Sequence, residues 1–321
     1  MRSLPILALF VGSVAVVGCE NAASKLDDVS KTPVSKVTEN GKNAEAPGAT
    51  PVQADHSGTV EERLKRLEDY QAKHGEAIDF LEKVYGQQKA QEQAQQRQQH
   101  APDAMFAVDV ADDVRIGAVD GPANAPVTIV KAFDFACPYC ERVSGTMEEL
   151  VKEYGGKVRV VYKNLVVHPQ VATDAHLASC AAAKQGKYMP FKELLWEKGF
   201  KAYASARDPS KLAEANLLAI AGEAGLNVDR LKTDMRSDEC KKLLAVDAAE
   251  MQKFQVNSTP TFFINGQHIG GALDKASFKQ IIDEKLKEVE KSGVPAGEYY
   301  AKVVLGKGEK KFRSMMDPKP N

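Results

Sequence analysis

The stretch Phe133-Asp134-Phe135-Ala136-Cys137-Pro138-Tyr139-Cys140 decides how this chain of 321 residues folds. Before it, the apolar run Val127–Val130 predicts a buried strand. After it, apolar residues recur at helical spacing, at Val143, Met147, Leu150, Val151 and Tyr154. We therefore expect Cys137 where a strand ends and a helix begins, with Cys140 one turn inside that helix.

Two cysteines at the start of a helix suit thiol–disulfide exchange. The first cysteine lies near unpaired backbone N–H groups and the positive end of the helix dipole, which stabilise a thiolate. Such a site lowers a cysteine pKa from about 8.5 to roughly 3.5–7.5. The second cysteine is partly buried and can attack a mixed disulfide from within. Pro138 fits an early helical position, where a missing N–H costs little.

Other uses of the cysteine pair fit the sequence less well. A zinc site would need a second Cys/His pair of similar spacing, whereas Cys180 and Cys240 lie 40 and 100 residues beyond Cys140. A purely structural disulfide between Cys137 and Cys140 would close almost no loop and so stabilise little. We expect neither a metal nor a cofactor.

The composition is that of a folded, nearly neutral protein. The chain is 43% hydrophobic and 27% charged, and 43 basic residues oppose 44 acidic ones for a net charge of −1. It contains no concentrated basic patch with interleaved aromatic residues. We therefore expect no nucleic-acid partner.

The pair Cys137-Pro138-Tyr139-Cys140 and the segment Asn257–Gly266 together resemble the DsbA-like branch of the thioredoxin superfamily. The resemblance covers roughly residues 104–293. It implies an α/β, thioredoxin-like fold with an inserted helical domain at about 165–255. The run Asn265-Gly266 itself predicts a tight hairpin between two strands.

The same resemblance assigns roles near the cysteine pair. It implies that Pro260 is cis and packs against the active-site cysteines, and that the backbone of Thr259 contacts the substrate peptide together with Pro138 and Tyr139. Lys131 lies where related oxidases often keep a buried acid. A cation there could favour the thiolate electrostatically, but we expect the amine to reach solvent.

Two further positions lie in the expected helical insertion. His168 is interpreted as a structural residue at the edge of the insertion. Cys180 and Cys240 match positions at which some family members form a second disulfide, which would close a loop of about 60 residues and stabilise the fold by a few kcal/mol. The alternative is that both cysteines are buried and reduced.

The N-terminus is typical of an exported bacterial lipoprotein. Arg2 and the apolar run Ile6–Val17 resemble a signal peptide, residues 1–18, and the small residues before Cys19 resemble a lipobox. The alternative is an ordinary signal peptide. Glu20 favours the outer membrane. We therefore expect a periplasmic protein with a lipid on Cys19, in a compartment where disulfides persist.

A tether and a long helix follow. Residues 19–58 are polar and predict a disordered tether. The segment 59–100 begins with a capping box and predicts a coiled-coil helix that runs into a Gln-rich linker. Its heptad positions are Val60, Leu64, Leu67, Gln71, His74, Ile78, Leu81 and Tyr85. This pattern favours a homo-oligomer formed through residues 60–85, the alternative being one amphipathic helix packed on its own domain.

The remaining domain boundaries follow from strand and helix patterns. A first strand is expected at Met105–Val110, and the thioredoxin-like domain is expected to span 101–293. Residues 294–321 are interpreted as a polar C-terminal tail.

The sequence favours a thiol–disulfide oxidoreductase that acts on exported client proteins with cysteines. Pro138-Tyr139 and Thr259-Pro260 resemble isomerase- or reductase-like members, and an oligomer would suit that role. One alternative is a disulfide-donating oxidase. A further alternative is a lipoprotein chaperone or scaffold without catalysis. An oxidoreductase of this kind also needs a membrane-bound or soluble redox partner.

Overall fold

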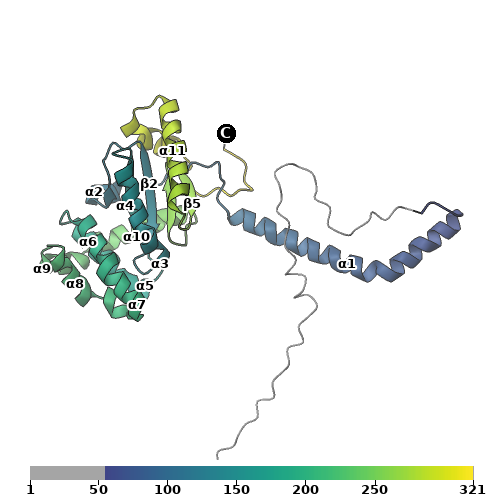
Figure 1. The fold of residues 1–321 in the computed structure, drawn as a ribbon, viewed down its shortest axis with the longest axis horizontal. Coiled ribbons are helices and arrows are strands. Elements are labelled where there is room, and N and C mark those ends of the chain that lie inside the picture. Colours follow the sequence, from purple (N-terminus) through teal and green to yellow (C-terminus); the bar gives the residue numbers. More distant parts are fainter. Residues whose placement is uncertain (1–54, 321) are drawn as a thin grey trace, which may run out of the picture. The chain divides into compact units, whose positions relative to one another are not determined.

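A computed structural model describes residues 55–320 (Figure 1). The expected signal peptide, Cys19 and nearly all of the tether lie outside the described residues, so these interpretations stay predictions. Among residues 55–320, no helix is both long enough and apolar enough to cross a membrane.

The first described element is helix α1 (Val60–Gln98). It begins at the predicted capping box, in which the Glu62 N–H donates to Thr59 Oγ1 (3.2 Å) and the Thr59 N–H donates to the Glu62 carboxylate (2.8 Å). No residue of α1 is buried, and the heptad leucines Leu67 and Leu81 are 67% and 63% exposed. The apolar stripe is thus formed as predicted and is open to solvent.

A five-stranded mixed sheet forms the centre of the folded domain, in the order β1-β3-β2-β4-β5. Strands β2 and β3 are parallel, and the other neighbours are antiparallel. The strands are β1 (Val119–Asp120), β2 (Val127–Phe133), β3 (Val158–Asn164), β4 (Thr261–Ile264) and β5 (Gln267–Gly270). Every residue of β2 is buried because this strand has a neighbour on each side and a layer on each face.

The two faces of the sheet are covered by different parts of the chain. On one face, Ile129 and Phe133 of β2 join a core with the helices α4 (Ser144–Glu153) and α11 (Lys275–Ser292). On the other face, Val130 and Ala132 join a second core. The members of that second core outside the sheet include Phe106, Val108, Met251, Phe254, Tyr299, Tyr300 and Val304.

The first strand predicted from the sequence is wrong. Residues 105–110 form no strand, and Phe106 makes only an isolated bridge with Glu309. The edge strand is β1, which follows the short helix α2 (Ala111–Ile116). The alternating apolar pattern arises because Phe106 and Val108 are fully buried under the sheet, although neither residue belongs to a strand.

The segment after residue 293 packs on the domain and does not form a free tail. It contains η4 (Ala296–Glu298) and η5 (Tyr300–Leu305), and the Tyr300 hydroxyl donates to the Val108 carbonyl (2.8 Å). Further on, the Phe312 N–H donates to the Lys253 carbonyl (2.8 Å). Lysines separate the few buried apolar residues of this segment, which is why its sequence resembles a polar tail.

The helical insertion between β3 and β4 is present. Its elements are α5 (Pro169–Ala183), α6 (Tyr188–Leu194), η2 (Leu195–Phe200), α7 (Lys201–Ala206), η3 (Pro209–Leu212), α8 (Glu214–Glu223), α9 (Val228–Met235) and α10 (Asp238–Lys253). Figure 1 shows α6, α7, α8 and α9 gathered beside one another. The predicted fold class, a thioredoxin-like α/β fold with inserted helices and a preceding helix, is confirmed.

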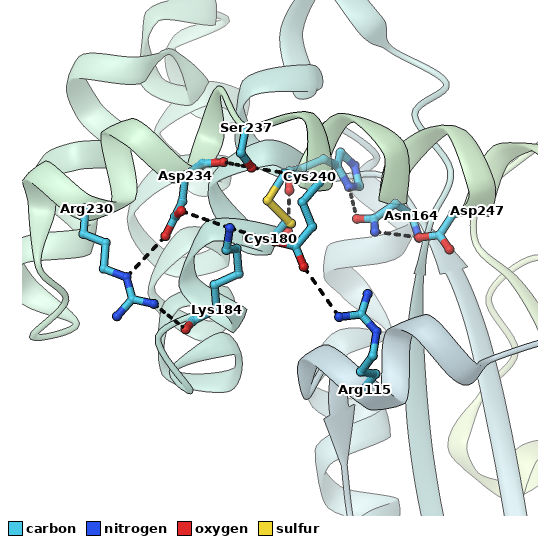
Figure 2. Close-up of a disulfide and its surroundings, with 12 residues drawn as sticks. Arg115, Asn164, Cys180, Lys184, Arg230, Asp234, Ser237, Cys240 and Asp247 are labelled. Atoms are coloured by element: carbon cyan, nitrogen blue, oxygen red, sulfur yellow. Dashed lines mark hydrogen bonds and ion pairs between the residues drawn. A yellow bond between two sulfur atoms is a disulfide. The ribbon is translucent and has the colours of Figure 1, made fainter.

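A disulfide between Cys180 and Cys240 joins α5 to α10 (Figure 2). Around it, the Lys184 amine lies 3.0 Å from Asp234 and 2.8 Å from the Glu239 carboxylate. The disulfide that the family resemblance implied is therefore confirmed, and the alternative of two reduced cysteines is wrong.

Removing this disulfide should destabilise the domain. Because the bond closes a loop of 60 residues, replacing Cys180 and Cys240 together by alanine should lower the free energy of unfolding by roughly 4 kcal/mol in the chain-entropy model. Denaturant unfolding of the oxidised proteins measures the change. A Cys137→Ala/Cys140→Ala variant is the matched control, since it also lacks two cysteines but loses no long-loop cross-link. Equal midpoints for the two variants would contradict the prediction.

Candidate active site

The cysteine pair lies where the sequence predicts it. Strand β2 ends at Phe133, and Cys137 is the N-cap of helix α3 (Pro138–Arg142), with Pro138 at its first position. The Cys140 and Glu141 N–H groups both donate to the Cys137 carbonyl, at 3.1 and 3.2 Å. Strand, loop and helix thus present Cys137 at the first turn and Cys140 one turn inside.

Asp134 holds the loop between the strand and the helix. Its side chain is fully buried and accepts hydrogen bonds from the Ala136 N–H (2.6 Å), the Val167 N–H (2.6 Å) and the His168 N–H (2.8 Å). One carboxylate therefore fixes both the cysteine loop and the segment that leads into the insertion. The His168 ring stays half-exposed, with Nδ1 3.4 Å from the Asp134 carboxylate, which also accepts from the His168 backbone N–H.

A second set of buried polar groups supports the same loop. The Phe135 N–H donates to His176 Nε2 (3.2 Å), and His176 Nδ1 lies 2.8 Å from Asn164 Oδ1. Burial lowers the pKa of His176 to about 4, so the ring is neutral near pH 7 and its Nδ1–H donates to Asn164. The Asn164 amide in turn donates to Asp247 (2.7 Å; Figure 2). The chain of contacts ends on α10, which the disulfide ties to α5.

Sequence reasoning missed Asp134, His176, Asn164 and Asp247. Apart from Ala136, which Asp134 contacts locally, their partners lie 12 to 84 residues away, so no local spacing indicates them. Only Asp134 leaves a trace in the sequence, because an acid directly after a buried strand is placed to accept backbone N–H groups.

The two sulfur atoms have opposite environments. Both cysteines are buried and reduced, and the Cys137 sulfur lies 3.3 Å from the Thr259 carbonyl oxygen. A hydrogen bond from the Cys140 thiol, aided by the Cys140 and Tyr139 N–H groups, lowers the pKa of Cys137 to about 5. Burial raises the pKa of the Cys140 thiol well above its ordinary value. Cys137 is thus the thiolate and nucleophile, and Cys140 stays a thiol.

The surface facing Cys137 is formed by the other predicted site residues. The Thr259–Pro260 peptide bond is cis, as the resemblance implied. Thr259 is partly exposed, Pro260 is buried, and Tyr139 is 53% exposed with the Arg142 guanidinium 5.0 Å from its ring centroid. Thr259 therefore contacts the Cys137 sulfur directly, Pro260 follows it across the cis bond, and Pro138 and Tyr139 follow Cys137 in α3.

A cavity of about 920 Å³ lies beside the segment that precedes Thr259. It begins at Asn257 and Ser258, which directly precede Thr259, and reaches Thr261 and His268 on β4 and β5. Amide side chains make up much of its wall, from Gln98, Gln99, Gln252, Gln255 and Asn257. Such groups offer both donors and acceptors to an uncharged chain.

The expectation for Lys131 is wrong. Its side chain is 0% exposed, and its amine does not reach solvent. Lys131 lies on β2, the strand with sheet neighbours on both sides, and its Nζ donates to the Cys140 carbonyl at 3.1 Å. Strand position alone could not reveal this, because a lysine in an alternating pattern ordinarily extends its stem to the surface.

The fold and this dithiol site define a thioredoxin-like protein. A family model described as Thioredoxin matches residues 113–284, more than half of the chain. The chain therefore belongs to the thioredoxin family.

Individual relatives match parts of the chain. The chain is 28% identical over 184 residues to the Na(+)/H(+) antiporter NhaA of Herminiimonas arsenicoxydans, which is 57% of this chain and 28% of that protein. It thus spans about a quarter of the length of the curated relatives it matches.

Solved structures match as well. A thioredoxin-like oxidoreductase from Silicibacter pomeroyi has 30% identity and a TM-score of 0.47, over 53% of this chain and 91% of that one. Oxidised BdbD from Bacillus subtilis has 23% identity and a TM-score of 0.48, over 54% and 95%.

The acidity of Cys137 can be tested directly. Alkylation of the reduced protein by iodoacetamide should rise to half of its plateau near pH 5, because the thiolate carries the reaction. An ordinary cysteine would titrate at about 8.5. The matched control is Cys140→Ala, which removes the hydrogen bond from the Cys140 thiol and should move the midpoint upward. A wild-type midpoint near the ordinary value would contradict the assignment.

Proposed function

We propose that this protein is an exported thiol–disulfide oxidoreductase that acts on protein disulfides through Cys137 and Cys140. The observation that carries the proposal is the asymmetry of the pair. The sulfur of Cys137 is held as a thiolate at a helix start and faces the Thr259 carbonyl. The sulfur of Cys140 is protonated beneath it. One sulfur can therefore attack, and the other can resolve.

The chemistry requires two exchange steps. The Cys137 thiolate attacks one sulfur of a client disulfide, so that the client S–S bond breaks, a mixed disulfide forms and one client thiolate leaves. Cys140 then loses its proton and attacks the Cys137 sulfur, which releases the second client thiolate and leaves a Cys137–Cys140 disulfide. The client gains two electrons, and the reverse sequence donates a disulfide to it.

Isomerisation uses the first step alone. A second client thiolate attacks the mixed disulfide at the client's own sulfur and expels Cys137, so no net electrons are transferred. A stabilised Cys137 thiolate favours the reduced pair, which an isomerase must retain and which a disulfide donor must yield. A net reductase needs the opposite balance. We therefore place isomerase activity first and disulfide donation second.

The neighbouring cavity supports a polypeptide as the substrate. An extended chain that places a disulfide against Cys137 and Thr259 can continue along Asn257 and Ser258, where the wall carries uncharged amides. Backbone N–H and C=O groups pair with such amides irrespective of the client sequence. This arrangement suits an enzyme that serves many clients.

The exposed seam of α1 supports assembly with a second copy of the same chain. Apolar side chains at heptad positions, among them Leu64 and Ile78, are 55% and 41% exposed in the single chain. A heptad stripe of this length is buried when two or more such helices associate. A lipid on Cys19 and the tether would then hold the oligomer at a membrane surface, with the domain in the periplasm.

Substitution of the cysteines tests the chemistry. Cys137→Ala should abolish turnover of a scrambled disulfide-bonded client, and Cys140→Ala should accumulate a mixed disulfide visible on non-reducing gels. The Cys180→Ala/Cys240→Ala variant is the control, because it loses two cysteines outside the site. If Cys137→Ala retained full activity toward the client, the protein would act as a chaperone or scaffold and the proposal would fail.

Substitution in the seam tests the oligomer. Leu67→Glu with Leu81→Glu places charge at two heptad positions and should convert the full chain to a monomer in sedimentation experiments. Both residues are exposed, so the domain should unfold at an unchanged midpoint. Glutamate at Gln87 and Gln93, which are exposed and lie outside the heptad register, is the matched control and should leave the oligomer intact. An unchanged mass for the leucine variant would exclude this seam.

A further inference from the structure

Lys131 is a buried cation next to the cysteine pair. It lies on β2 between Tyr162 of β3 and Phe262 of β4, and its side chain has no exposed surface. Its Nζ donates to the Cys140 carbonyl (3.1 Å) and lies 5.9 Å from the Tyr162 ring centroid and 6.0 Å from that of Phe133. The amine therefore lies in an aromatic pocket below the second cysteine.

The other buried lysines have carboxylate partners. Lys163 lies 2.7 Å from Asp113 and 2.8 Å from Asp247, and the Lys192 amine lies 2.9 Å from Glu148. For Lys131, by contrast, no carboxylate in the described part of the chain is within ion-pair distance.

The groups that face Lys131 can be named element by element. Glu148 of α4 and Lys192 of α6 carry opposite charges and pair with each other. The Tyr162 phenol of β3 accepts from Lys192 (3.3 Å). The remaining titratable groups are the thiols of Cys137 and Cys140. Glu148 already pairs with Lys192 and Cys140 is a thiol, so the Cys137 thiolate is the unpaired anion that these described groups offer the amine.

An unpaired buried ammonium destabilises a protein unless an anion compensates for it. The reduced pair supplies one, because Cys137 is a thiolate, whereas the oxidised pair carries no charge. Burial lowers the pKa of Lys131 to about 8, which leaves it mostly charged near neutrality and mostly neutral well above that. The charge on Lys131 therefore destabilises the disulfide form relative to the reduced pair.

We propose that Lys131 is a positioning residue that shifts the Cys137–Cys140 equilibrium toward the reduced pair, so that the disulfide is more readily donated. The inference rests on the proposed function and adds which form of the pair is favoured: a reduced pair serves isomerisation, and the same shift makes donation the favoured net reaction. In the donating reaction, a client dithiol loses two electrons and two protons and forms an S–S bond, while the Cys137–Cys140 bond breaks. Cys140 takes one proton, Cys137 stays a thiolate, and the second proton goes to solvent.

The test is the equilibrium of the full-length protein with reduced and oxidised glutathione at about pH 7. Lys131→Met keeps the length and apolar stem but removes the charge, and should shift the equilibrium constant roughly tenfold or more toward the disulfide. For this two-electron couple, tenfold corresponds to a reduction potential lower by about 30 mV. Lys131→Gln, which keeps a donor for the Cys140 carbonyl, should shift it in the same direction.

Two controls separate charge from packing. Lys192→Met removes a second fully buried lysine whose charge is already balanced by Glu148, and should change the equilibrium less than about threefold. At about pH 9.5 the Lys131 amine is largely neutral. The difference in equilibrium constant between wild type and Lys131→Met should therefore be smaller at that pH. A packing effect would persist at that pH.

The outcomes distinguish this inference from the proposed function. The inference is overturned if both Lys131 variants stay within about twofold of wild type, if Lys192→Met shifts the equilibrium equally, or if the gap is unchanged at high pH. In each of these cases a Cys137-dependent activity would still stand. If the pair fails to exchange with glutathione at all, the proposed function and the inference both fail.

Discussion

The buried carboxylate of Asp134 is the contact on which the site depends. By accepting three backbone N–H groups, it fixes the loop that carries Cys137 and the connection from β3 into the helical insertion. Next to it, His176 of α5 accepts a hydrogen bond from the Phe135 N–H, and Asn164 of β3 accepts one from His176. Buried polar groups that are fully paired hold one conformation well, because every displaced partner would leave an unsatisfied group. The cysteine pair thus lies on a rigid support that reaches as far as α10.

The inserted helices therefore do more than cover the sheet. The disulfide joins α5, which carries His176, to α10, which carries Asp247, and these side chains meet at Asn164. A permanent disulfide thus stabilises the surroundings of a reactive dithiol. The two pairs differ because Cys180 and Cys240 are buried and joined within the helical insertion, whereas Cys137 lies at the helix start that activates it.

Local patterns predicted the parts of the fold that local physics determines. The strand, the cysteine pair at a helix start, the hairpin at Asn265-Gly266 and the capped helix α1 all follow from short-range spacing, and the family resemblance supplied the disulfide and the cis Pro260. What the sequence could not show depends on long-range contacts. A lysine in a strand carries no sign that its amine ends below Cys140. Nor does the pattern at residues 105–110 reveal that its apolar residues are covered by a segment two hundred residues away.

The C-terminal segment has a consequence for where the domain ends. It runs back past the foot of α1, where the Met315 N–H donates to the Gln99 carbonyl (3.0 Å) and the Ala101 N–H donates to the Arg313 carbonyl (3.0 Å). These two hydrogen bonds join the first residues of the domain to its last ones. A chain cut at residue 293 would uncover the sheet face that contains Val130 and Phe263. That exposed apolar face would promote aggregation, although the shortened chain would still contain every residue of the dithiol site.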